Sequence, residues 1–157
     1  MTRQTLYRHW PRRELLLAEI VTTGPDVGYP QPGTSAQNVL TEFLTSLRDG
    51  LNDPPSVASL LAISAEAGSD PAAGKALAAI SADRRAALNV LLAPAGVHID
   101  ENDFARLVGP VIYRLLHARG TVTSVLITDT VDAWLHSRAT PQPLAHDQPA
   151  PPPPGGQ

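Results

Sequence analysis

Apolar side chains recur at three- and four-residue intervals along most of this 157-residue chain, and each such segment ends near proline or glycine. That spacing places apolar residues on one face of an α-helix, whereas a half-buried strand would need strict alternation. The clearest case covers Phe104, Leu107, Val108, Val111, Ile112, Leu115 and Leu116. The pattern predicts an all-α protein with about seven helices and no sheet.

Proline and capping residues set the expected helix limits. A side-chain acceptor followed by proline predicts helix starts at Pro54 and Pro71, because a proline in the first turn loses no hydrogen bond. Asp100 is expected to begin another helix. Pro110 lies inside that helix and should kink it, since its ring removes a backbone bond. The last helix is expected over residues 122–137.

Composition limits the possible functions. Hydrophobic residues make up 43% of the chain, which is enough to form a core, and there is no cysteine for disulfides, thiolate metal sites or thiol catalysis. The five histidines have no metal-binding spacing, and the glycines form no phosphate-binding loop. We therefore expect no enzyme activity, no metal and no cofactor. No apolar run reaches the ~18 residues of a membrane span, so we expect a cytoplasmic protein with no membrane partner.

Charge is unevenly distributed. Residues 1–13 contain four arginines and no acid, giving +4, whereas the remainder has eight basic and fifteen acidic residues, giving −7. A basic end on an acidic body could bind a polyanion. On charge alone, an ordinary solvated basic end explains the pattern better.

The spacing within residues 2–10 suits a helix that reads DNA, and Pro11 would end it. Leu6 and Trp10 share one side and would face inward, while polar and basic side chains face outward. Gln4 can pair with adenine and arginine with guanine in the major groove. Threonine, tyrosine and histidine can bind phosphates, which fixes register without reading sequence.

The stretch MTRQTLYRHWPRRELLLAEIV resembles the second half of the DNA-binding domain of the tetracycline-repressor (TetR/AcrR) family of bacterial transcription regulators. The matching positions include Thr5-Leu6-Tyr7, His9-Trp10 and Glu14-Leu15-Leu16. The resemblance implies that DNA is contacted by Thr2, Arg3, Gln4, Thr5, Tyr7, Arg8, His9 and Arg13.

The family's domain begins with two further helices before this one, and it usually has valine where this sequence has Met1. We therefore expect residues 1–24 to be a partial, N-terminally truncated helix-turn-helix domain comprising the recognition helix and the helix after it. Without the missing helices, the chain as it stands should bind DNA poorly. Residues 25–138 would form a TetR-like effector-binding and dimerisation domain. Residues 139–157, rich in proline, are expected to be a disordered tail.

The segments DENDFARLVGPVIYRLLHARG and TDTVDAWL are similar to the last two helices of many family members, which form a dimer. The last helix is also apolar over a wide arc, which supports a homodimer. The expected interface residues are Val108, Ile112, Leu115, Val131, Trp134 and Leu135. An apolar effector cavity is expected among Phe43, Leu47, Leu60, Leu61 and Tyr113, although Tyr113 could instead pack at an interface.

These expectations define a transcription regulator, in the family's usual mode a repressor, that binds a double-stranded operator as a homodimer and responds to a small-molecule effector. The alternative is a truncated dimerisation and ligand-binding module without DNA binding of its own. A small helical enzyme would need a catalytic constellation that the sequence does not provide.

Overall fold

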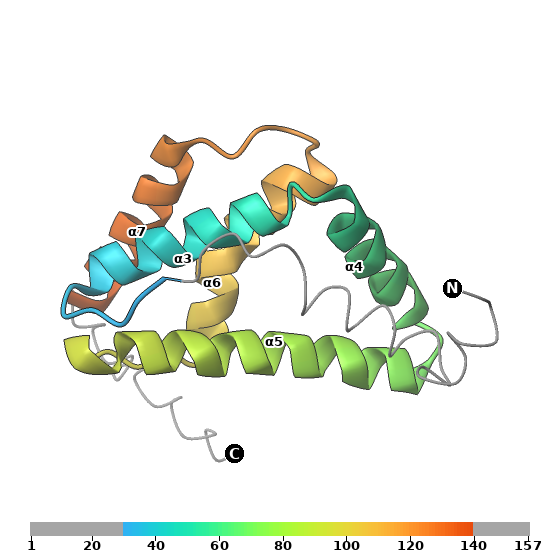
Figure 1. The fold of residues 1–157 in the computed structure, drawn as a ribbon, viewed down its shortest axis with the longest axis horizontal. Helices are drawn as coiled ribbons and strands as arrows, with labels where there is room; N and C mark the ends of the chain where they lie inside the picture. The colour runs from blue at the N-terminus through green and yellow to red at the C-terminus, as the bar shows by residue number, and fades with distance from the viewer. Residues whose placement is uncertain (1–29, 140–157) are drawn as a thin grey trace, which may run out of the picture.

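The computed structural model describes residues 30–139, and every regular element in this range is helical (Figure 1). The all-α prediction is therefore confirmed for this part of the chain. The elements are α3 (Ala36–Gly50), α4 (Pro54–Glu66), α5 (Pro71–Leu92), the 3₁₀ helix η1 (Ala93–Ala95), α6 (Glu101–Ile112), the π-helix η2 (Tyr113–His117) and α7 (Ser124–Ala139). The expected N-terminal helices and the proline-rich tail lie outside the described residues.

Side-chain caps begin the helices, and those before Pro54 and Pro71 lie where the sequence predicted them. Ser35 accepts a hydrogen bond from the backbone N–H of Asn38, and Asp53 and Asp70 cap the two helices that open with proline. Each cap satisfies an N–H group that has no partner inside its helix. At the end of η1, Gly96 takes a left-handed conformation with a φ of 66°, which glycine adopts without steric cost.

The main core packs α3, the C-terminal part of α5, α6 and α7 around one set of buried side chains. In Figure 1, α3 passes between α7 on one side and α5 on the other. Members with no exposed surface include Leu40, Leu44, Leu88, Leu92, Ile99, Leu107, Val111 and Val131. Their apolar burial is the principal force that holds these four helices together.

The second packing unit, which we call the arm, consists of residues 54–82 and covers α4 and the first half of α5. Its own buried cluster is smaller and contains Ile63, Ala73 and Ile80. Leu60 and Leu77 are half-buried beside them. In Figure 1, α4 extends from the end of α3 to the beginning of α5 at one end of the molecule. The arm is thus tied to the main core chiefly through the continuous helix α5.

Two details differ from the sequence-based expectations. Pro110 lies inside α6 as expected, but the regular helix gives way only at Tyr113, to a π-helical turn. A proline blocks an i→i−4 bond on its N-terminal side only, so the helix can continue beyond it. The last helix begins at Ser124, because Val122 is used to fill the core from the preceding connection.

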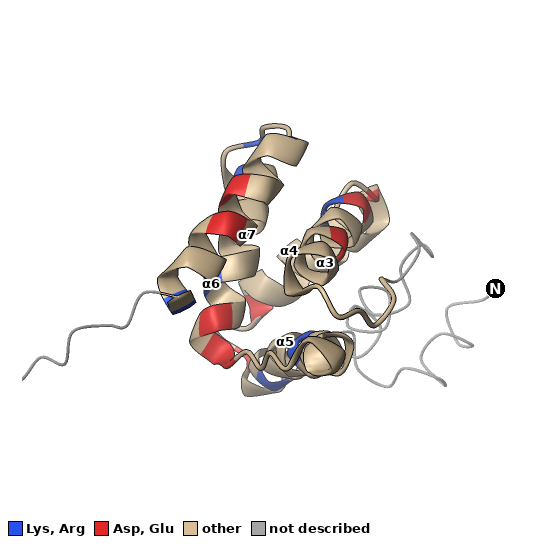
Figure 2. Ribbon diagram, turned by 90° about the vertical axis from the view of Figure 1, so that its left-hand side faces the viewer, with Lys and Arg blue, Asp and Glu red and all other residues tan. Residues whose placement is uncertain are grey.

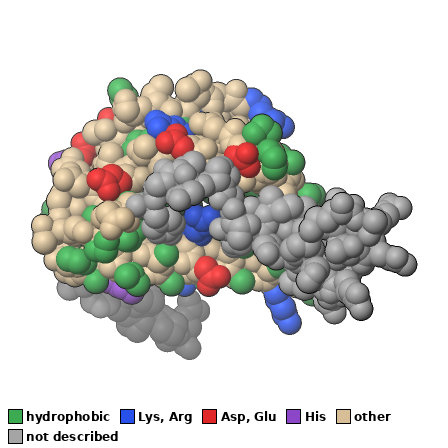
Figure 3. Space-filling model, viewed as in Figure 1, with side chains coloured by type: hydrophobic (Ala, Val, Ile, Leu, Met, Phe, Trp, Pro, Cys, Tyr) green, Lys and Arg blue, Asp and Glu red, His purple; other side chains and the backbone are tan. Residues whose placement is uncertain are grey.

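The surface between Pro30 and Ala139 is mixed in character. Acidic and basic residues are distributed along several of the helices (Figure 2). Apolar side chains appear in several separate groups among polar atoms (Figure 3). The large exposed apolar residues are Leu61, Val90, Tyr113 and Val125. Within this range, no helix combines the length and apolar character needed to cross a lipid bilayer.

Candidate functional site

The eight residues predicted to contact DNA all lie between Thr2 and Arg13, outside the described residues. Their predicted roles therefore stay predictions. The described part begins with Pro30, which is buried, and continues along the C-terminal end of α5. There the N–H of Gly33 donates to the carbonyl oxygen of Leu91 at 3.4 Å. The chain that follows the predicted recognition segment thus joins the body beside the end of α5.

The residues predicted to line an effector cavity fall in different surroundings. Phe43 is buried in the main core, where its ring meets that of Phe104 edge-on with a centroid separation of 6.2 Å. Leu47 is half-buried at the margin of the same core, whereas Leu60 packs in the arm. Leu61 is 37% exposed and Tyr113 is 64% exposed. The structure therefore does not bring these five side chains together around one space.

The residues predicted to form a dimer interface divide into two groups. Val108, Val131 and Trp134 are buried within one chain, where they belong to the main core. Ile112, Leu115 and Leu135 are half-buried and pack against that core from its margin. Packing within the chain therefore accounts for much of the wide apolar arc on α7. Only the second group retains surface that another molecule could contact.

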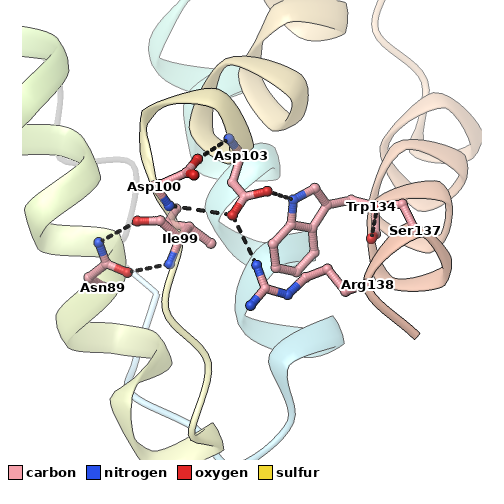
Figure 4. A network of polar contacts seen from close by, with 7 residues as sticks. All are labelled: Asn89, Ile99, Asp100, Asp103, Trp134, Ser137 and Arg138. Atoms are coloured by element: carbon pink, nitrogen blue, oxygen red, sulfur yellow. Dashed lines mark hydrogen bonds and ion pairs between the residues drawn. The ribbon is translucent and has the colours of Figure 1, made fainter. Parts of the chain in front are cut away.

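The best-defined polar arrangement among the described residues is the Asp103 cluster, which consists of Asp100, Asp103, Trp134 and Arg138 (Figure 4). Asp100 caps α6 by accepting from the N–H of Asp103 at 2.8 Å. In return, the N–H of Asp100 donates to Asp103 Oδ2 at 3.4 Å, completing a capping box. The same carboxylate accepts from Trp134 Nε1 at 3.0 Å and from Arg138 Nη1 at 2.9 Å.

This cluster fastens the last turn of α7 to the first turn of α6. The guanidinium of Arg138 also lies over the Trp134 ring, 4.8 Å from its centroid, in cation–π geometry. Both oxygens of Asp103 are occupied, and its side chain is only 18% exposed. The carboxylate therefore acts as a structural acceptor, and this geometry provides no free acid–base pair for catalysis.

Asn89 braces the connection between α5 and α6 (Figure 4). Its Nδ2 donates to the carbonyl oxygen of Ile99 at 3.1 Å, and its Oδ1 accepts from the N–H of Ile99 at 2.9 Å. A side-chain amide that makes both bonds mimics a paired backbone and satisfies groups that burial removes from water. This brace fixes the residue immediately before the cap of α6, so it also positions the Asp103 cluster.

At the opposite end of α6, η2 presents exposed aromatic and basic side chains. The rings of Tyr113 and His117 stack with a centroid separation of 5.9 Å. Arg114 lies over Gly120, where an added Cβ would come within 2.6 Å of Arg114 Nε. Arg119 adopts a positive φ of 52°. Cations at this end of a helix favourably oppose its dipole, which is a structural explanation for the basic residues.

A side-chain hydrogen bond on the surface joins α3 to α7. Gln37 Nε2 donates to Asp132 Oδ1 at 2.9 Å.

At the other end of α3, the hydrogen bond from Arg48 Nε to Asp49 Oδ1, 2.7 Å long, raises the pKa of Arg48 above its ordinary value. Arg48 therefore stays charged throughout the accessible pH range.

Between residues 30 and 139, no three histidine or acidic side chains lie close enough together to bind a metal ion. No protein-family model, curated protein or solved structure shows significant similarity to this chain. The Asp103 cluster and the Asn89 brace were not anticipated from the sequence. The acidic residues before the apolar stripe of α6 indicated that a helix begins near Asp100. Nothing in that pattern indicated that Trp134 and Arg138 would bind Asp103.

Proposed function

We propose that this chain is a transcription regulator of the TetR type, in which residues 1–24 contribute to DNA reading and residues 25–138 form a dimerising, effector-responsive body. The observation that carries the proposal is the motif between Thr2 and Leu16, where about ten positions match one recognition pattern. A helical body after the motif supports it, because helix bundles supply the dimer contacts and ligand sites of such regulators.

The proposed dimer would use the accessible margin of α6 and α7. Ile112, Leu115 and Leu135 are half-buried there, and Val125 is 65% exposed. Substituting Leu135 with glutamate should split the dimer at micromolar concentration while leaving helicity intact, since the side chain is not fully enclosed. Light scattering and circular dichroism measure the two effects. Val131 is unsuitable for this test, because a charge at a fully buried position would unfold the body.

DNA binding is tested with the product of the entire reading frame to which Met1 belongs, on DNA from upstream of its own gene. We expect affinity to fall steeply with salt, because arginines displace counterions from phosphates. Gln4→Ala should relax base preference by about 1–3 kcal/mol at one position in each half-site. Tyr7→Phe is the matched control and should weaken all sequences about equally, since it removes a phosphate contact.

The outcomes separate the two candidate functions. Salt-dependent, sequence-selective binding that Gln4→Ala relaxes would support the regulator. A stable dimer that binds no DNA at low salt would instead support a dimerisation and ligand-binding module. Binding that Gln4→Ala leaves fully selective would contradict the assignment of residues 2–10 as the recognition helix.

A further inference from the structure

An apolar strip lies on the side of α4 that faces away from α5. The strip consists of Val57, Ala58, Leu61 and Ala65, which fall within an arc of about 100° at 100° per residue. Leu61 and the two alanines are exposed, and Val57 is half-buried. The opposite side of α4 packs on α5 through residues such as Ile63.

The arm has few charges to keep such a strip in water. Only Glu66, Asp70 and Lys75 are charged among its 29 residues, and Asp70 is engaged as a helix cap. Surface helices normally carry charged residues on their outer face. A charge-poor outer face with an exposed leucine is therefore expected to be covered by another segment or molecule.

We propose that this strip is the docking site of residues 12–23 of the same chain. In a helix over this segment, Leu16, Leu17, Ile20 and Val21 would share one face, and Arg13 would lie at the N-terminal end of that face. Arg12 and Glu19 would lie on the other side. The segment therefore offers an apolar face that needs a partner, matching the apolar strip on α4.

The length of the connection allows this contact. Gly33 is held beside Leu91 at the C-terminal end of α5, and Ile80 lies eleven residues earlier on the same helix. That separation corresponds to about 16 Å along the axis. Since Pro30 is already placed in this part of the structure, the connection runs from Thr23 to Pro30, and its seven residues can span about 22 Å. The end of the segment can thus reach the arm, and a helix of about 18 Å can then extend along it.

The first test is hydrogen exchange on the full chain with Leu61→Glu. Exchange in residues 12–23 should become about tenfold faster, because the charge opposes apolar docking. Leu16→Glu should reciprocally accelerate exchange in α4. Val90→Glu is the matched control, since Val90 is 68% exposed on α5 outside the strip, and it should leave both segments unchanged.

The second test uses the absence of native cysteine. A short bis-maleimide should cross-link Leu17→Cys to Leu61→Cys within one molecule, but not Leu17→Cys to Val90→Cys. Mixing heavy- and light-isotope chains distinguishes links within a chain from links between chains. Links only between chains would assign the strip to a second copy and overturn the proposal. Unchanged exchange in Leu61→Glu, or free-peptide exchange rates in residues 12–23 of the parent protein, would also overturn it.

Discussion

The main core and the arm are held together in different ways. In the main core, buried apolar side chains are supplemented by side-chain bonds between segments far apart in the chain, such as those of Asp103 and Asn89. In the arm, side-chain bonds such as those of Asp53 to Ser56 and of Asp70 to Ala72 cap the starts of single helices. Local caps stabilise single helices, whereas bonds between distant segments also fix how helices sit against each other. We therefore expect the main core to be the more stable region.

The largest expected effect is a cavity in the main core. Leu107→Ala should reduce the free energy of unfolding by about 3–4 kcal/mol, because Leu107 is fully buried and its neighbours cannot fill the space completely. Leu61→Ala in the arm should cost less than about 1 kcal/mol, since that side chain is already partly in water. Urea denaturation monitored by circular dichroism measures both. Equal losses would contradict the difference in burial between these two side chains.

Removing the Asp103 carboxylate should have an intermediate effect. Asp103→Ala leaves the indole N–H of buried Trp134 without its acceptor and should cost about 2–3 kcal/mol. Asp103→Asn can still accept from Trp134 but loses the ion pair with part-exposed Arg138 and the acceptor for the Asp100 N–H, so it should cost about 1–2 kcal/mol. Thermal unfolding of the two variants provides the comparison. An alanine variant as stable as the asparagine variant would show that the Trp134 bond contributes little.

The Asn89 brace should have the smallest effect of the three. Asn89→Ala removes both bonds to Ile99 and should cost about 1–2 kcal/mol. Asn89→Asp keeps the acceptor for the Ile99 N–H but places a carboxylate oxygen against the Ile99 carbonyl oxygen, so its loss should be at least as large. Amide exchange at Ile99 is the sharpest readout, because that N–H is released only in the alanine variant. Unchanged protection there would mean that packing alone holds the connection.

Local chemistry predicted much of the described fold. Proline after a side-chain acceptor located the starts of α4 and α5, and spaced apolar residues located α6, because both signals operate within one or two turns. The same signals could not show which helix α7 would pack against. Val131 and Trp134 were therefore expected to contact a second molecule, whereas the structure buries both in the chain's own core.

The candidate site was harder to anticipate for the same reason. Phe43, Leu60 and Tyr113 share apolar or aromatic character, yet they lie in the main core, in the arm and on the surface, respectively. Residue type indicates a tendency to be buried, whereas a shared cavity depends on the placement of several helices. The pairing of Asp103 with Trp134, 31 residues apart, likewise required the tertiary fold.

Native-state hydrogen exchange across residues 30–139 tests the difference between the two regions most directly. The account predicts that the amides of α4 exchange through a local opening whose free energy is well below that of global unfolding, because few buried side chains hold this helix. The amides of α6 and α7 near the Asp103 cluster should exchange only through global unfolding. Equal opening free energies in α4 and α6, both at the global value, would contradict the account.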